Sequence, residues 1–159
     1  MSEHGTIIES LEPPDAVIES KPVVKSARGS IATLILGESG SGKTTSLRNL
    51  DPATTLLIQP IRKPLPFRPV GWEPIVNGKG SILVTDDAIK IESAIEQAHE
   101  LGKQIVVVDD FQYIMANEFM RRAREKGFDK WSEIGQNGWL VIKAASNAAH
   151  GVRVYVMAH

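Results

Sequence analysis

Residues 36–45 read LGESGSGKTT, and this short stretch gives the strongest prediction of the fold. The eight residues that begin at Gly37 satisfy the pattern G-x-x-x-x-G-K-[ST], in which glycines let backbone N–H groups turn toward a phosphate. Residues 31–36 (IATLIL) are nearly all apolar, which predicts a buried parallel strand. A helix is expected over residues 42–50. A strand, a glycine-rich loop and a helix in this order predict a phosphate-binding site.

The motif assigns chemistry to its own side chains. Lys43 would reach the β- and γ-phosphates of a nucleotide, and the Thr44 hydroxyl would hold Mg²⁺. The expected helix adds the positive end of its dipole. The residues expected to bind the nucleotide are Gly37, Glu38, Ser39, Gly40, Ser41, Gly42, Lys43, Thr44 and Thr45. The alternative is a glycine-rich turn that only resembles such a loop, and the flanking strand and helix disfavour it.

A second anchor lies at residues 105–110 (IVVVDD), where four aliphatic residues precede two acids. A buried strand with this pattern places a carboxylate at its C-terminal end, where ligands bind in open α/β sheets. We therefore expect Asp109 to hold Mg²⁺ through its water shell, with a helix-capping role as the alternative. Asp110 is the candidate that activates water, and capping of the next helix is again its alternative.

The rest of the chain alternates strands with helices. Besides residues 31–36, strands are expected at residues 54–58, 81–85, 104–110 and 152–157. Helices are expected from the capping residue Asp87 to Leu101, at residues 111–126 and at residues 129–149. Residues 60–80 hold five prolines, which favours a long structured loop. The pattern predicts an α/β fold with a mainly parallel sheet of about five strands flanked by helices.

Composition narrows the protein class further. The 159 residues suit a single domain. The formal net charge of -1 does not indicate that the surface as a whole binds nucleic acid. There are no cysteines, which excludes disulfides and thiolate metal sites. No apolar run reaches the length of a membrane helix. We expect a soluble cytoplasmic protein with no membrane partner, a flexible leader at residues 1–28 and one domain at residues 29–159.

Several stretches resemble one family, the RecA-like, single-domain P-loop ATPases of tailed bacteriophages, which act beside single-strand binding proteins in recombination and annealing. The phosphate loop and its helix, GESGSGKTTSLRNLDP, match at the level of the superfamily. Residues 62–68 (RKPLPFR), 106–135 (VVVDDFQYIMANEFMRRAREKGFDKWSEIG) and 153–159 (RVYVMAH) are more specific. Together the matches span most of residues 30–159.

The resemblance implies a RecA-type core that binds ATP and Mg²⁺ between neighbouring protomers and acts on single-stranded DNA in the cytoplasm of a bacterial host. It also implies a homo-oligomer, a single-strand binding protein as partner, and His159 as the polar sensor of the γ-phosphate. Cores of this family continue past the sensor strand, so the resemblance implies a core shortened at its C-terminus. Residues 56–64 (LLIQPIRKP) lack the glutamate with which RecA itself activates water.

Basic and aromatic residues leave two interpretations open. Arg121, Arg122, Arg124 and Lys126, together with Arg62, Lys63 and Arg68, would contact DNA phosphates or reach a neighbour's nucleotide as basic fingers. Interleaved acids favour the alternative of a solvated surface. Trp131 and Trp139 are expected to be core anchors rather than stacking platforms for bases.

Three functions compete at this point. The first is an ATPase of the RecA-like kind that acts on single-stranded DNA. The second is a kinase for a small molecule or nucleotide, with residues 60–80 as the acceptor site. The third is an ATP-binding scaffold or helicase-loader module that does not hydrolyse. Nucleotide binding is common to all three, whereas the partner and the fate of the γ-phosphate distinguish them.

Overall fold

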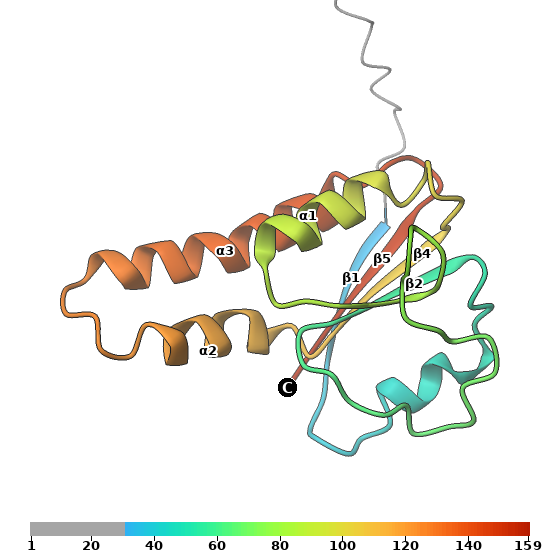
Figure 1. Cartoon of the computed structure of the whole chain (residues 1–159), viewed down its shortest axis with the longest axis horizontal. Coiled ribbons are helices and arrows are strands. Elements are labelled where there is room, and N and C mark those ends of the chain that lie inside the picture. The colour runs from blue at the N-terminus through green and yellow to red at the C-terminus, as the bar shows by residue number, and fades with distance from the viewer. Residues whose placement is uncertain (1–30) are drawn as a thin grey trace, which may run out of the picture.

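The computed structural model describes residues 31–159 and contains one five-stranded sheet with helices packed against it (Figure 1). The strands are β1 (Ile31–Leu36), β2 (Thr55–Gln59), β3 (Ile82–Val84), β4 (Ile105–Asp109) and β5 (Arg153–Ala158). Their spatial order is β1-β5-β4-β2-β3, and all neighbouring pairs are parallel. The predicted α/β class and parallel sheet are confirmed. The expected leader at residues 1–28 lies outside the described residues.

Four helical segments connect the strands. They are the 3₁₀ helix η1 (Thr44–Asn49) and the α-helices α1 (Ala88–Gln97), α2 (Gln112–Arg121) and α3 (Asp129–Ser146). The expected cap of α1 is present, because Asp87 Oδ1 accepts hydrogen bonds from the backbone N–H groups of Ile89 and Lys90 at 3.0 and 3.3 Å. All four lie close to their predicted positions, but η1 differs from the expectation in type.

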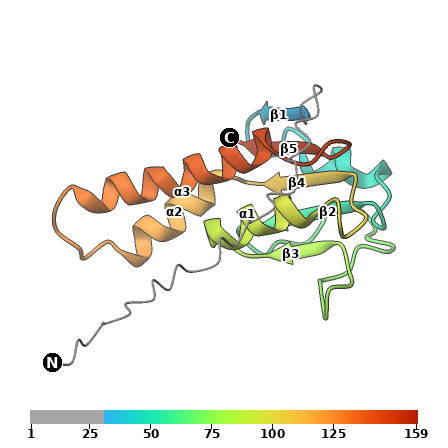
Figure 2. The same cartoon turned by 90° about the horizontal axis from the view of Figure 1, so that it is seen from above.

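The sheet separates two hydrophobic cores. Figure 2 shows α1 and α3 on one face, and the other face is covered by η1 and the loop of residues 60–80. Because side chains alternate along a strand, Val106 and Val108 of β4 enter the core under the helices, whereas Val107 packs with Leu47 and Trp72 on the opposite face. β2 and β4 are therefore buried on both faces, as their continuous apolar sequences predict.

The expectation of a buried strand at residues 31–36 is wrong. β1 is an edge strand that pairs with β5, and within residues 31–159 no strand pairs with its other side. Ile31, Leu34 and Leu36 keep 58%, 57% and 69% of their surface exposed. Hydrophobicity alone cannot separate a central strand from an edge strand, because both consist of short apolar runs.

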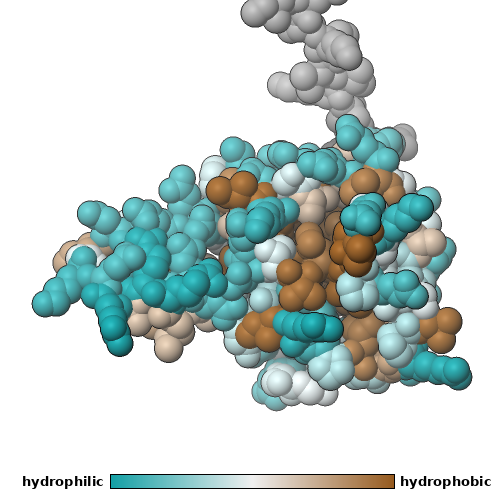
Figure 3. All heavy atoms as spheres, in the orientation of Figure 1, coloured by the Kyte–Doolittle hydropathy of each residue, from teal (hydrophilic) through white to brown (hydrophobic). Residues whose placement is uncertain are grey.

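The helical hairpin of α2 and α3 projects beyond the sheet (Figures 1 and 2). α3 has 18 residues and is about 27 Å long, whereas a six-residue strand spans about 20 Å. In the view of Figure 3 hydrophobic residues gather over the sheet, and the projecting end is mostly hydrophilic. Among the helices of residues 31–159, none has the length and apolarity that crossing a membrane requires.

The expectation that Trp131 and Trp139 anchor the core is also wrong, since they keep 51% and 58% of their surface exposed. The buried stripe of α3 runs instead through Ile134, Gly138 and Val141, so both tryptophans fall off it. Trp131 stacks on Phe119 of α2, with ring centroids 4.9 Å apart.

Residues 60–80 form the long structured loop that their prolines predict. Trp72 is buried in this loop and packs edge-on against Phe67, with ring centroids 6.1 Å apart. The loop end is also tied to the start of β2 by Lys103, whose Nζ donates to the carbonyls of Pro52, Ala53 and Gly80 at 3.2, 2.9 and 3.1 Å. Lys103 therefore fixes the end of the loop beside the start of β2, whereas Trp72 packs the middle of the loop against Leu57 of β2.

Candidate functional site

The glycine-rich loop joins β1 to η1 and is shaped by two left-handed glycines. Gly40 and Gly42 have φ values of +80° and +92°, a region that side chains rarely adopt. The Nζ atom of Lys43 folds back under the loop and donates to the carbonyls of Gly37 and Glu38 at 2.5 and 3.0 Å. The loop therefore closes around its own lysine, and its outer surface faces a cavity.

The helix expected after this loop is only the six-residue 3₁₀ segment η1. Ser46 shows why, because its N–H is shared between the carbonyls of Gly42 and Lys43, and its hydroxyl donates to the Lys43 carbonyl at 2.6 Å. Such local side-chain bonds compete with α-helical geometry. The dipole contribution expected from a helix at residues 42–50 is therefore reduced.

Asp109 lies at the C-terminal end of β4, directly opposite the loop. Thr44 Oγ1 donates to Asp109 Oδ2 at 2.9 Å, so the two expected metal-binding side chains are in contact. Asp109 is only 1% exposed. Its other oxygen, Oδ1, is buried and has no hydrogen-bond partner among residues 31–159. A buried carboxylate with an unsatisfied oxygen is costly unless a cation or another donor reaches it.

Asp110 adopts a left-handed conformation with φ +68°. This conformation is strained for most residues and is tolerated best by Asn and Asp among those with side chains. The capping alternatives for both acids are not supported, because in the described structure no side chain bonds the N-terminal N–H groups of α2. Instead Asp110 Oδ1 lies 3.5 Å from His159 Nδ1 at the end of β5.

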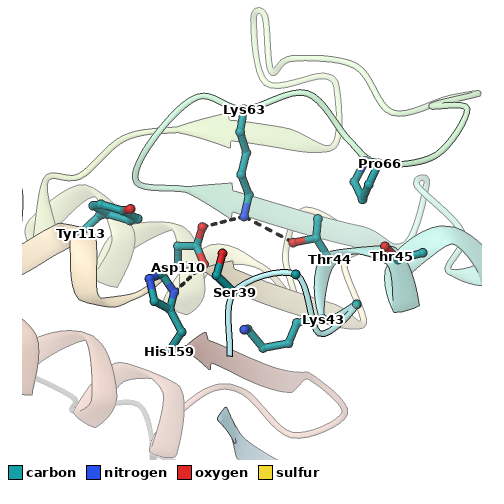
Figure 4. Close-up of a pocket in the computed structure, with 11 residues that line it drawn as sticks. Ser39, Lys43, Thr44, Thr45, Lys63, Pro66, Asp110, Tyr113 and His159 are labelled. Atoms are coloured by element: carbon teal, nitrogen blue, oxygen red, sulfur yellow. Dashed lines mark hydrogen bonds and ion pairs between the residues drawn. The ribbon is translucent and has the colours of Figure 1, made fainter. Parts of the chain in front are cut away.

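Lys63, from the loop after β2, joins these groups (Figure 4). Its Nζ lies 2.9 Å from Asp109 Oδ2, 2.6 Å from Asp110 Oδ2 and 3.3 Å from Thr44 Oγ1. Partial burial by itself lowers the pKa of Lys63, but hydrogen bonds and charge attraction from Asp110 and Asp109 outweigh it and raise the pKa above its ordinary value. The ammonium group is therefore charged at neutral pH.

These groups border an open cavity of about 360 Å³. Its lining residues are Ser39, Gly40, Gly42, Lys43, Thr44, Thr45, Lys63, Pro66, Asp110, Tyr113 and His159. The structure thus brings together six of the expected loop residues, the expected water-activating acid and the expected sensor. Asp109 lies beneath the cavity, hydrogen-bonded to Thr44, whereas Gly37, Glu38 and Ser41 do not line it.

Three residues in or beside the candidate site are not identified by the sequence motifs. Lys63 appears in the sequence only as one of several scattered basic residues, and Tyr113 only as an aromatic residue after an acidic strand. Gln112 Nε2 lies 2.7 Å from His159 Nδ1 and orients that ring. The signal that could have found Lys63 is its position four residues after β2, because β2 lies next to β4 and the C-terminal ends of parallel strands share one edge.

The donor set admits a small divalent cation. Mg²⁺ in nucleotide sites commonly uses one or two protein carboxylates or hydroxyls and takes its remaining ligands from phosphates and water. Thr44 and Asp109 supply such a pair, and the unsatisfied Asp109 Oδ1 leaves further acceptor capacity. Within residues 31–159 no group of three or more His, Cys, Asp and Glu side chains forms a metal cage. The arrangement therefore suits a metal ion that takes some of its ligands from a bound phosphate and water, rather than one coordinated by protein side chains alone.

Comparison with protein-family models, with curated proteins and with solved structures gave no significant match to this chain. The geometry of the site and the residues of the sequence motifs therefore carry the information on function.

Proposed function

We propose that this protein is a P-loop NTPase. It would bind Mg²⁺ together with a nucleoside triphosphate, with ATP as the first candidate, and hydrolyse the nucleotide. The observation that carries the proposal is the 2.9 Å contact between Thr44 and Asp109, two residues assigned to the metal from separate motifs. The cavity beside them is polar, is bordered by the glycine-rich loop and contains Lys43. A glycine-rich turn that only resembled a phosphate loop would not be expected to lie against an acidic side chain from a distant strand.

The metal would be held by Thr44 and Asp109, and it would neutralise phosphate charge and orient the triphosphate. Lys43 is placed in the loop, where release from the carbonyls of Gly37 and Glu38 would free its ammonium group for phosphate oxygens. Asp110 is the proposed acceptor of the water proton, since it reaches the cavity and no glutamate among residues 31–159 lines it. His159, held by Gln112 and close to Asp110, is the proposed sensor of the terminal phosphate.

The direct test is ATP binding by Lys43→Ala, measured by calorimetry with and without Mg²⁺. We expect the wild-type protein to bind Mg–ATP and the variant to lose at least tenfold in affinity, which corresponds to about 1.4 kcal/mol. Lys79→Ala is the matched control, because Lys79 is an exposed loop lysine that does not line the phosphate cavity. Equal affinity of wild type and Lys43→Ala would refute the proposed site.

Single-stranded DNA is the proposed macromolecular partner, as the family resemblance implies. The support from the structure is the exposed Trp131 and Trp139 on the projecting hairpin, with Lys143 Nζ 4.9 Å from the centroid of the Trp139 ring. Exposed aromatic rings beside cations can stack on bases while the charges contact phosphates. Action in phage recombination or replication, assembly of several copies and a single-strand binding partner stay predictions of the resemblance.

One observation favours a kinase as the second candidate. A second cavity, of about 500 Å³, shares Lys63 with the phosphate cavity and is bordered by Gln59, Trp72 and prolines of residues 60–80. A small phosphate acceptor would fit there. The two functions differ in product: phosphorus NMR of protein incubated with Mg–ATP alone shows orthophosphate for an ATPase. A kinase instead needs an added acceptor, such as a nucleoside monophosphate, before ATP is consumed.

A further inference from the structure

We propose that the ammonium group of Lys63 is a built-in cation of the metal position, which a divalent ion must displace from Thr44, Asp109 and Asp110 when it binds. This inference rests on the proposed function, because it concerns the same site. It adds a residue to that site that none of the motifs assigns there. It also predicts how the site behaves when no nucleotide is present.

The geometry of Lys63 is that of a cation in a ligand shell. Its Nζ contacts three oxygens, and two of them, Thr44 Oγ1 and Asp109 Oδ2, are the atoms proposed to hold the metal. The third oxygen, Asp110 Oδ2, belongs to the proposed water-activating acid and is the nearest at 2.6 Å. Figure 4 shows the Lys63 side chain reaching into the site from the loop above, between Asp110 and Thr44.

Charge balance explains why this position holds a cation. Asp109 and Asp110 are consecutive carboxylates, and Asp109 is almost completely buried. Two carboxylates close together in a partly dry site repel one another unless a positive charge lies between them. Lys63 supplies one positive charge, whereas a divalent ion supplies two at the same oxygens. Like charges at contact distance repel, so the ammonium group and the metal exclude one another.

The main chain of Lys63 is anchored while its ammonium group can move. The side chain of Gln59, which is buried, donates from Nε2 to the Lys63 carbonyl at 3.3 Å, and Pro64 follows directly. Four flexible methylene groups separate this anchor from Nζ. A displaced ammonium group therefore stays at the border of the same cavity, where it also frees Asp110 from its ion pair. Metal entry and release of Asp110 are thus one event.

The test uses Mn²⁺ alone, without nucleotide, titrated against the full chain while EPR reports the free ion. We expect Lys63→Met to bind Mn²⁺ at least tenfold more tightly than the wild type, because the competing cation is gone. Arg62→Met is the matched control, since Arg62 is adjacent in sequence and does not border the phosphate cavity, and it should bind like the wild type. Asp109→Asn in the Lys63→Met background should abolish the gain, which locates the ion.

A second measurement needs no destabilising substitution. In wild-type protein labelled with ¹⁵N-lysine, the ion-paired Lys63 ammonium signal, assigned by its absence in Lys63→Arg, should shift and broaden when Mg²⁺ alone is added. The inference is overturned if wild type and Lys63→Met bind Mn²⁺ with equal affinity. It is also overturned if the position and width of the Lys63 ammonium signal do not change when Mg²⁺ is added. The proposed function fails separately, when Lys43→Ala binds Mg–ATP as the wild type does, because neither Lys63 experiment contains nucleotide.

Discussion

Thr44 Oγ1 donates a 2.9 Å hydrogen bond to Asp109 Oδ2, although the two residues are 65 positions apart in the chain. The C-terminal ends of β1 and β4 bring them together, because both strands pair with β5, run in the same direction and end at the same edge of the sheet. The contact joins the glycine-rich loop to the acidic strand in a single site.

Removal of the Thr44 hydroxyl should weaken the use of Mg²⁺. In Thr44→Val the shape of the side chain is kept, but one proposed metal ligand and the bond to Asp109 are lost. We expect the Mg²⁺ concentration that half-saturates ATP binding to rise at least tenfold, about 1.4 kcal/mol, as measured by calorimetry at several metal concentrations. Thr33→Val in β1 makes the same chemical change outside the cavity and should leave the metal requirement intact. An unchanged requirement in Thr44→Val would remove Thr44 from the metal site.

Asp110→Asn should separate binding from turnover. Asparagine also tolerates the left-handed conformation at φ +68°, so the backbone of the site is expected to survive the change. Loss of the proton acceptor should lower the rate of ATP hydrolysis by roughly 10²–10⁴-fold. The affinity for Mg–ATP should fall much less. Orthophosphate release and calorimetry measure the two quantities, and a variant that hydrolyses at the wild-type rate would exclude Asp110 as the base.

Lys103→Met should destabilise the fold without touching the site. Lys103 is 9% exposed, and its Nζ donates to three backbone carbonyls that tie the 60–80 loop to β2. Loss of these donors leaves partly buried carbonyls unsatisfied, so the free energy of unfolding should fall by about 1–3 kcal/mol in urea denaturation. Lys79→Met, a change at an exposed lysine, is the control and should stay within about 0.5 kcal/mol of wild type.

The contacts of Asp86 predict a loss of stability in acid. Partial burial raises the pKa of Asp86, but hydrogen bonds from Arg121 and Asn117 and the charge of Arg121 outweigh it, so the pKa lies below its ordinary value. A depressed pKa in the folded state adds stability above the unfolded pKa of about 3.9, and this is lost as the pH falls through the folded pKa.

Thermal unfolding of wild type and Asp86→Asn between pH 3 and pH 7 measures this contribution. The wild-type melting temperature should exceed that of the variant at neutral pH, and the difference should shrink below about pH 4. Curves that stay parallel over the whole range would show that Asp86 does not contribute in this way.

Trp139→Ala should weaken binding of single-stranded DNA. If bases stack on the exposed ring, its loss should cost about 1–3 kcal/mol, measured by fluorescence anisotropy of a labelled oligonucleotide. The affinity of wild type should also fall as salt rises from 50 to 200 mM, because phosphate contacts release counterions. Ile89→Ala, an exposed apolar residue of α1, is the control and should bind DNA like the wild type. Equal binding by wild type and Trp139→Ala would remove the hairpin from the DNA site.

Local sequence patterns were sufficient for the fold class and for most members of the site. The glycine-rich loop, the acidic strand and the alternation of strands with helices each involve neighbouring residues, so each pattern can be recognised without distant parts of the chain. A parallel α/β sheet with Lys43, Thr44, Asp109 and Asp110 at one edge could therefore be predicted from local patterns alone.

Features that depend on strand order and on packing could be known only from the three-dimensional structure. Whether residues 31–36 are central or at an edge depends on which strands lie beside them. The exposure of Trp131 and Trp139 depends on which face of α3 packs against the rest of the protein. The position of Lys63 against Asp109 and Asp110 depends on the adjacency of β2 and β4 and on the path of a proline-rich loop. Lys63 is one of several scattered basic residues in the sequence, and it becomes part of the site only because the sheet places two carboxylates next to its ammonium group.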